Sequence, residues 1–168
     1  PLGQRHAYSD YYASHCGKFE LVSDITGLPL WVSCCFGGRG SERAIMEYDG
    51  CGLTFKEYWG LFQKQFQEEF GEDATLALMA DKGTRVRDLV KELHGQYICP
   101  SSLKDGLVML VDAEKNEEIA QARVHVERAI GRVKRFRILT GTLPHKLMPK
   151  IDDILFVCVW ASIYQPCD

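Results

Sequence analysis

The stretch that decides the fold class is "ATLALMAD", residues 74–81, because it joins a strand pattern to a chemical group at its end. Residues 74–80 form a continuous apolar run of strand length, and the run stops abruptly at the carboxylate of Asp81. Runs of this kind are typical of strands whose two faces are both covered. We therefore predict a buried central strand that ends at Asp81.

The residues well upstream of this strand predict a hairpin. Residues 18–26 and 30–36 are rich in strand formers and flank a Gly/Pro turn, a pattern that favours two paired antiparallel strands. Residues 1–16 show no period, so we predict an irregular lead-in there. A helical pattern begins at Ala44, after a glycine-rich segment that we expect to be flexible.

Helix and strand patterns alternate along the rest of the chain. Residues 53–70 place large apolar side chains at helical spacing, with Thr54 as an N-cap and Glu57 three residues later. Beyond Asp81 we predict a helix, a short strand, a loop and two more helices, at residues 85–94, 96–100, 101–110, 112–136 and 151–163. This order predicts an α/β fold with a mixed sheet, in one domain that covers residues 1–168.

Composition and charge exclude several classes of protein. The chain has 168 residues, of which 46% are hydrophobic and 26% charged, as in an ordinary globular protein. Its formal net charge of −3 excludes a uniformly cationic nucleic-acid binder, so any DNA-binding surface must be local. No apolar run approaches the roughly 20 residues that span a bilayer, and we therefore predict no membrane partner.

The cysteine pattern favours reduced thiols. Seven cysteines are present without a CxxC pair, and Cys34 and Cys35 are adjacent, so they would point to opposite faces of a strand. We interpret this pattern as that of a nuclear or cytosolic protein rather than a disulfide framework. A zinc site is the weaker alternative, because His and Cys do not cluster at ligand spacing.

Asp81 is the first candidate for chemistry. Ligands of α/β sheets bind outside the carboxyl ends of the strands, which is where the predicted strand places this carboxylate. The alternative is that Asp81 only caps the helix that begins near Arg85.

Glu127 is the second candidate, because it is the one acid in a basic segment. The stretch "RVHVERAIGRVKRFRIL", residues 123–139, holds six Lys or Arg residues around Glu127, which borders an apolar stripe on the predicted helix. A simple explanation is an ion pair between Glu127 and Arg123, four residues apart. That pair leaves the other cations unbalanced, and such a helix repels itself unless a polyanion compensates.

The two carboxylates make chemical sense together. Asp81 and Glu127 would repel each other at a sheet edge unless a divalent cation lay between them, and Mg²⁺ prefers oxygen ligands of this kind. Two such ions can clamp the attacking and leaving oxygens of a phosphodiester. Glu127 would then be a metal ligand, and the cations around it would face nucleic-acid phosphates.

The basic segment also resembles a known signature. The stretch "ARVHVERAIGRVKRFRIL", residues 122–139, closely resembles the C-terminal signature of PIF/Harbinger-type transposases, which are DDE superfamily endonucleases. Four further segments resemble the same family in order: "YSDYYASHCGKFELVSDITGLPLWVS" (8–33), "FGGRGSER" (36–43), "LMADKG" (78–83) and "IDDILFVCVWASIYQP" (151–166). The resemblance covers nearly the whole chain.

The resemblance implies a fold and a site. The family has an RNase H-like fold, a mixed sheet flanked by helices, and cuts and joins DNA with two Mg²⁺ or Mn²⁺ ions on an Asp, Asp, Glu triad. Asp81 matches the second aspartate and Glu127 the glutamate, 127 − 81 = 46 positions apart. The first aspartate and its strand are expected upstream of Pro1, so that the domain is N-terminally truncated. We expect DNA-phosphate contacts among the basic residues of the long helix: Arg123, Arg128, Arg132, Lys134 and Arg135.

The resemblance also implies partners and a location. DNA is the expected substrate, a separate Myb-like protein the expected targeting partner, and the nucleus the expected location, with the cytoplasm as an alternative. An oligomeric state does not follow from it.

The sequence departs from the family pattern at two positions. Glu42 stands where the family's GGR-x-SD turn has aspartate, and Thr84 where an aromatic residue usually follows DKG. Three hypotheses therefore stay open: an active endonuclease, a domesticated relative that binds DNA or protein without cutting, and a globular protein with a salt-bridged helix. Because Asp81 and Glu127 are two acids of a triad, we expect these 168 residues alone not to cleave DNA.

Overall fold

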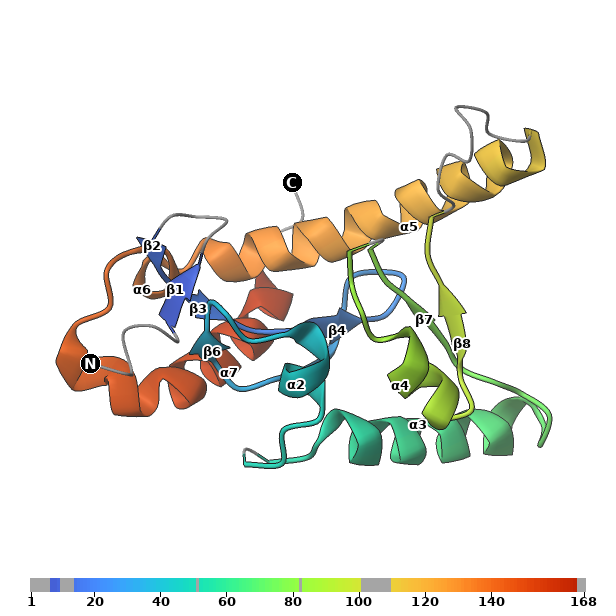
Figure 1. Cartoon of the computed structure of the whole chain (residues 1–168), viewed down its shortest axis with the longest axis horizontal. Helices are drawn as coiled ribbons and strands as arrows, with labels where there is room; N and C mark the ends of the chain where they lie inside the picture. The colour runs from blue at the N-terminus through green and yellow to red at the C-terminus, as the bar shows by residue number, and fades with distance from the viewer. Residues whose placement is uncertain (1–6, 10–13, 51, 82, 101–109, 166–168) are drawn as a thin grey trace. The chain divides into compact units, whose positions relative to one another are not determined.

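The computed structural model describes residues 7–9, 14–50, 52–81, 83–100 and 110–165 (Figure 1). They form a mixed α/β structure of short strands and helices, in agreement with the predicted fold class at this level. The chain forms two compact units. The first unit combines residues 1–45 and 125–168, and the second unit holds residues 46–124. That both belong to one domain of residues 1–168 stays a prediction.

The predicted hairpin is present in the first unit. Strands β4 (Leu21–Ser23) and β5 (Pro29–Val32) pair antiparallel. Asp24 organises the turn between them, because its Oδ1 accepts hydrogen bonds from the amides of Thr26 at 2.8 Å and Leu28 at 2.9 Å. The turn also contains Gly27 at a φ of +84°, a conformation that glycine adopts without strain.

Two smaller antiparallel pairs accompany the hairpin. Strand β3 (Gly17–Lys18) pairs with β6 (Phe36–Gly37), and β1 (Tyr8–Ser9) pairs with β2 (Ser14–His15). The prediction of an irregular lead-in is therefore wrong for its described part, because two-residue strands are too short to show a sequence period. Helix α2 (Glu42–Met46) begins before the predicted Ala44.

Helix α5 (Leu110–Lys134) begins in the second unit and ends in the first, and further helical segments of the first unit follow it among the described residues. The predicted helices at 112–136 and 151–163 correspond to α5 and to α7 (Ile151–Ala161) with η2 (Ser162–Tyr164). Two short helices, α6 (Arg137–Thr140) and η1 (His145–Lys150), occupy the segment between them, for which we predicted no element from the sequence.

The core of the first unit joins α5 and α7 to the sheet residues. Val133, Leu155 and Val159 are buried together, and Leu21 and Val32 of the hairpin pack against them. Burying apolar side chains is the main term that holds such elements together. In addition, the Cys35 amide donates to Asp152 Oδ1 at 2.6 Å, which ties the start of α7 to the chain after β5.

The second unit contains the predicted capped helix, α3 (Phe55–Phe70). Thr54 Oγ1 accepts from the Glu57 amide at 3.1 Å, and Glu57 Oε2 accepts from the Thr54 amide at 2.9 Å. These two reciprocal bonds are the capping box that the sequence predicted. Trp59 is buried and donates through Nε1 to the carbonyl of Leu93 at 3.2 Å.

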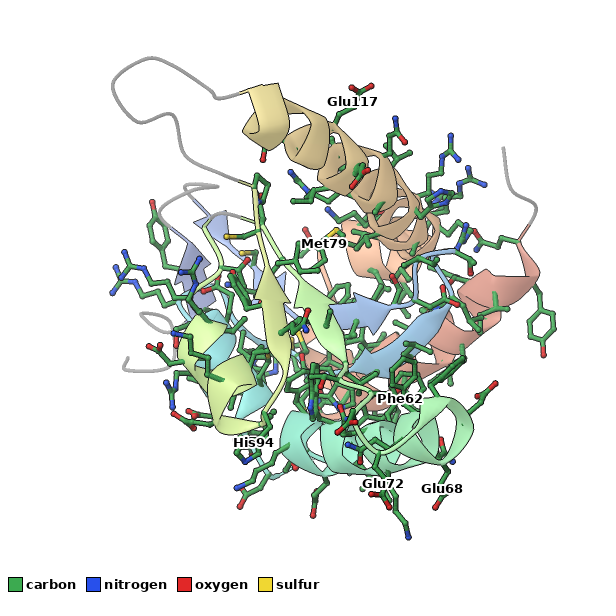
Figure 2. The ribbon with its side chains drawn as sticks, turned by 90° about the vertical axis from the view of Figure 1, so that its right-hand side faces the viewer. Phe62, Glu68, Glu72, Met79, His94 and Glu117 are labelled. Carbon is green, nitrogen blue, oxygen red and sulfur yellow. The ribbon has the colours of Figure 1, made fainter. Side chains whose placement is uncertain are left out.

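The same unit contains a parallel β-α-β arrangement. Strand β7 (Ala77–Met79) pairs in parallel with β8 (Gln96–Ile98), and α4 (Arg87–Glu92) connects them. Met79 and His94 lie on β7 and on the turn between α4 and β8 (Figure 2). The strand predicted at 74–80, the helix predicted at 85–94 and the strand predicted at 96–100 are thus confirmed as β7, α4 and β8. Each of the three is shorter than predicted. The predicted loop at 101–110 lies outside the described residues except for its last position.

Strand β7 differs from the prediction in its burial. Leu76 and Leu78 are buried, but Ala77 between them is exposed. Among the described residues β7 pairs with β8 alone, so the structure does not show it as a central strand with both faces covered. An apolar run does not show whether both faces of the strand are covered when one of its residues is alanine, because the small apolar area of alanine costs little to leave exposed.

Candidate catalytic site

Asp81 follows the carboxyl end of a parallel strand, as predicted. It lies two residues beyond β7, and its side chain is 61% exposed. The residue before helix α4 is Val86, whose side chain makes no capping hydrogen bond. Asp81 is therefore not the N-cap residue of α4, which is the role that the alternative explanation gave it.

Arg123 of α5 lies beside Asp81 in the second unit. Its Nη2 is 3.4 Å from Asp81 Oδ2, and 35% of the Arg123 side chain is exposed. Ion pairs as exposed as this contribute about 1 kcal/mol or less to stability. The pair can thus open at little cost when a competing ion approaches either partner.

Glu127 is exposed on α5, one turn after Arg123. It belongs to the first unit and Asp81 to the second, so the predicted approach of their carboxylates stays a prediction. Within the described ranges, no group of three or more His, Cys, Asp or Glu side chains is arranged to hold a metal ion.

The basic residues of α5, together with Arg135 directly after it, differ in their surroundings. Arg132 is partly buried, and its Nη2 donates to the Gly27 carbonyl at 2.9 Å, so this arginine anchors the hairpin turn to the helix. Arg128, Lys134 and Arg135 are exposed. The sequence analysis gave all five cations the same predicted role, contact with DNA phosphate. Helical spacing does not show which of these side chains contacts a turn that is distant in the sequence.

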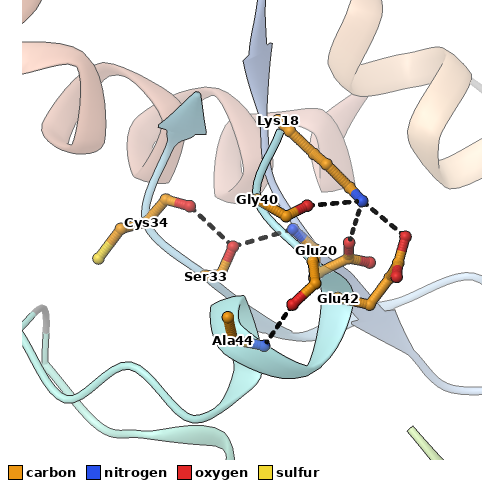
Figure 3. A network of polar contacts seen from close by, with 8 residues as sticks. Lys18, Glu20, Ser33, Cys34, Gly40, Glu42 and Ala44 are labelled. Carbon is orange, nitrogen blue, oxygen red and sulfur yellow. Dashed lines mark hydrogen bonds and ion pairs between the residues drawn. The ribbon is translucent and has the colours of Figure 1, made fainter. Parts of the chain in front are cut away.

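A polar network around Lys18 was not recognised in the sequence (Figure 3). Lys18 Nζ lies 2.6 Å from Glu42 Oε1 and 3.6 Å from Glu20 Oε1, and it donates to the Gly40 carbonyl at 3.2 Å. Burial raises the pKa of Glu20; Lys18 opposes this shift, and Glu42 adds to it. Glu42 thus supplies a carboxylate at the position where the related pattern has aspartate. Lys18 and Glu42 both lie in segments that resemble the family, and this resemblance was the one sequence signal that could have indicated the network.

The cysteines correct one expectation. Cys34 is disulfide-bonded, so the prediction of reduced thiols is wrong for this residue. Cys16, Cys35, Cys99 and Cys158 are free. A sequence without a CxxC pair can still form a disulfide at another spacing, so the missing motif did not exclude one.

Comparison with protein families defines the class of protein. A family model described as DDE superfamily endonuclease matches residues 1–161. The chain therefore belongs to the DDE superfamily endonucleases. Membership indicates transposase-like nuclease function and DNA as the substrate. A search of curated proteins found no match, and a search of solved structures found none. Among the described helices, none is long and apolar enough to cross a membrane.

The metal that this family typically uses can be tested against the residues present. The carboxylate of Asp81 is exposed and follows a strand end, and carboxylate oxygens are the ligands that Mg²⁺ and Mn²⁺ prefer. Glu127 offers a second exposed carboxylate. The donor chemistry of both residues therefore fits a divalent ion.

Proposed function

We propose that this chain is the nuclease domain of a PIF/Harbinger-type transposase, with an RNase H-like arrangement, that hydrolyses and transfers DNA phosphodiesters. The observation that carries the proposal is the exposed carboxylate of Asp81 at the end of a parallel strand, in a chain of the DDE endonuclease family. Glu127 is the proposed second acid. The location that we propose is the nucleus, and the proposed targeting partner is a Myb-like protein.

We assign the charged residues distinct tasks. Asp81 and Glu127 would hold Mg²⁺ or Mn²⁺, which would polarise a phosphoryl oxygen and acidify a water molecule. Arg123 balances the Asp81 carboxylate before an ion binds, and the exposure of their pair lets the guanidinium turn to a phosphate instead. Arg128, Lys134 and Arg135 would hold the DNA backbone through its phosphates.

The test is DNA cleavage in Mg²⁺ or Mn²⁺ by a protein that also supplies the first aspartate of the triad, with Asp81→Asn and Glu127→Gln, because these 168 residues alone are expected not to cleave. Each substitution removes a negative ligand while it keeps the shape of the side chain, so we expect cleavage to be lost. Asp88→Asn on α4 and Glu117→Gln on α5 are matched controls, because both acids are exposed; Glu117 points outward in Figure 2. Full activity of both site variants would contradict the proposal.

A second candidate is a domesticated transposase that binds DNA or a protein without cutting. The pairing of Asp81 with Arg123 favours it, because an aspartate that serves only an ion pair needs no metal. This candidate predicts that the wild-type protein binds duplex DNA but leaves it intact in either metal. It also predicts that Asp81→Asn leaves the DNA affinity unchanged.

A further inference from the structure

One face of α5 combines positive charge with an exposed glycine. Arg128, Gly131 and Lys134 of α5, and Arg135 directly after it, are all exposed, while Ala129 and Val133 are buried on the other side of the helix. At a rise of about 1.5 Å per residue, the face from Arg128 to Lys134 extends along roughly 9 Å of the helix axis. Arg123 and Arg132 do not belong to it, because both are only partly exposed.

Gly131 has no packing reason within the described part of the chain. Apart from its chain neighbours and the backbone of its own helix, a Cβ at this position would have no atom of that part within 4 Å. Glycine in an exposed helix interior is less favourable than alanine, because it loses more conformational freedom on folding. Gly27 and Gly95 differ, since a Cβ there would meet the His125 carbonyl and the Trp59 ring.

A second helix provides a comparison. Gly60 in α3 is also exposed, with nothing described within 4 Å of its Cβ position. The residues one turn from Gly60 are Lys56, Glu57, Gln63 and Lys64, whose charges are mixed. One turn from Gly131 lie Arg128, Lys134 and Arg135, with Glu127 as the single acid. The glycine alone therefore does not mark a surface; its cationic surroundings do.

We propose that this face of α5 is where the sugar-phosphate backbone of duplex DNA approaches the protein most closely, with Gly131 at the point of contact. The absent side chain lets a DNA strand reach the helix backbone, and Arg128, Lys134 and Arg135 contact the phosphates on either side. Charge complementarity selects this occupant, because a cluster of cations attracts a polyanion in a chain whose net charge is −3. The inference rests on the proposed function and assigns the DNA-contacting part of that site.

The test depends on a substitution of Gly131 that raises the stability of the fold while it weakens DNA binding. Gly131→Ala and Gly131→Gln are compared with Gly60→Ala and Gly60→Gln, by thermal unfolding and by fluorescence anisotropy with a labelled DNA duplex. Replacing an exposed helical glycine with alanine is expected to raise Tm by about 2–4 °C at either position. Gly131→Gln is expected to weaken DNA binding about tenfold, the equivalent of one charge-assisted hydrogen bond, and Gly131→Ala by a smaller factor. The Gly60 variants are expected to bind like the wild-type protein.

The possible results separate this inference from the proposed function. If the wild-type protein binds DNA and Gly131→Gln binds equally well, the inference is overturned while the proposed function stands. Equal weakening by Gly60→Gln would overturn it too, as would a lowered Tm for Gly131→Ala, because the glycine would then serve the fold. If the wild-type protein binds no DNA at low salt, the proposed function itself fails.

Discussion

Gly27 is the position where one added methyl group should disturb the first unit most. It lies in the β4–β5 turn with a φ of +84°. A Cβ at this residue would lie 2.7 Å from the carbonyl oxygen and 3.3 Å from the carbonyl carbon of His125 on α5. The Gly27 carbonyl also accepts the 2.9 Å hydrogen bond from Arg132. Gly27→Ala therefore perturbs the point where the hairpin turn meets the helix.

The expected loss of stability has two parts. Holding alanine in a left-handed conformation costs about 1–2 kcal/mol. The contact with His125 is 0.7 Å shorter than 3.4 Å, the lower limit of an ordinary contact, and the atom it meets belongs to the backbone. The turn must therefore move away from α5, at an overpacking cost of about 1–3 kcal/mol. We expect Gly27→Ala to lower the free energy of unfolding by about 2–5 kcal/mol in total.

The assay is urea unfolding followed by far-UV circular dichroism, with two comparisons. Gly52→Ala has a φ of +70° but no described atom within 4 Å, so it should show the conformational cost alone. Gly27→Asn keeps the steric conflict, but asparagine tolerates a left-handed conformation better than alanine. We therefore expect it to recover only a part of the loss. If Gly27→Ala costs no more than Gly52→Ala, or if Gly27→Asn restores wild-type stability, the close contact with His125 does not matter as argued.

Three further predictions concern other parts of the chain. Thr54→Ala removes the capping hydroxyl and should lower the free energy of unfolding by about 1 kcal/mol in the same urea experiment; an unchanged midpoint would contradict the role of the cap. Burial tends to raise the pKa of Asp24, but hydrogen bonds from the Thr26 hydroxyl and the turn amides lower it overall. Stability from this group is thus fully present above its ordinary pKa and is lost as the pH falls through the lowered one. Asp24→Asn should flatten this acid dependence in unfolding measured between pH 5 and pH 2, roughly the range over which such a carboxylate titrates, and an unchanged dependence would refute it. If DNA phosphates contact Arg128 and Lys134, replacing either with glutamine should reduce the slope of log affinity against log salt by about 0.9; an unchanged slope for both would count against the contact.

The sequence by itself determined the features that neighbouring residues create. The capping box needs only Thr54 and a glutamate three residues later, and both bonds form as the spacing predicts. The hairpin was visible because strand formers flank a Gly/Pro turn, and the long helix because its apolar residues repeat. Asp81 was found as a candidate because it ends an apolar run. The motifs around residues 122–139 also indicated the endonuclease family that the family model confirms.

The tertiary structure decided which distant groups meet. Helical spacing offered Glu127 as a partner of Arg123, and the fold also places the guanidinium near Asp81, 42 positions away. In the same way Arg132 reaches the Gly27 carbonyl across 105 positions, and so serves the fold of the first unit. Such contacts depend on how the chain folds back on itself. They join residues that are far apart in the sequence, so no local pattern of residue types indicates them. Charge and spacing thus identify candidate residues, whereas only packing assigns each of them a partner.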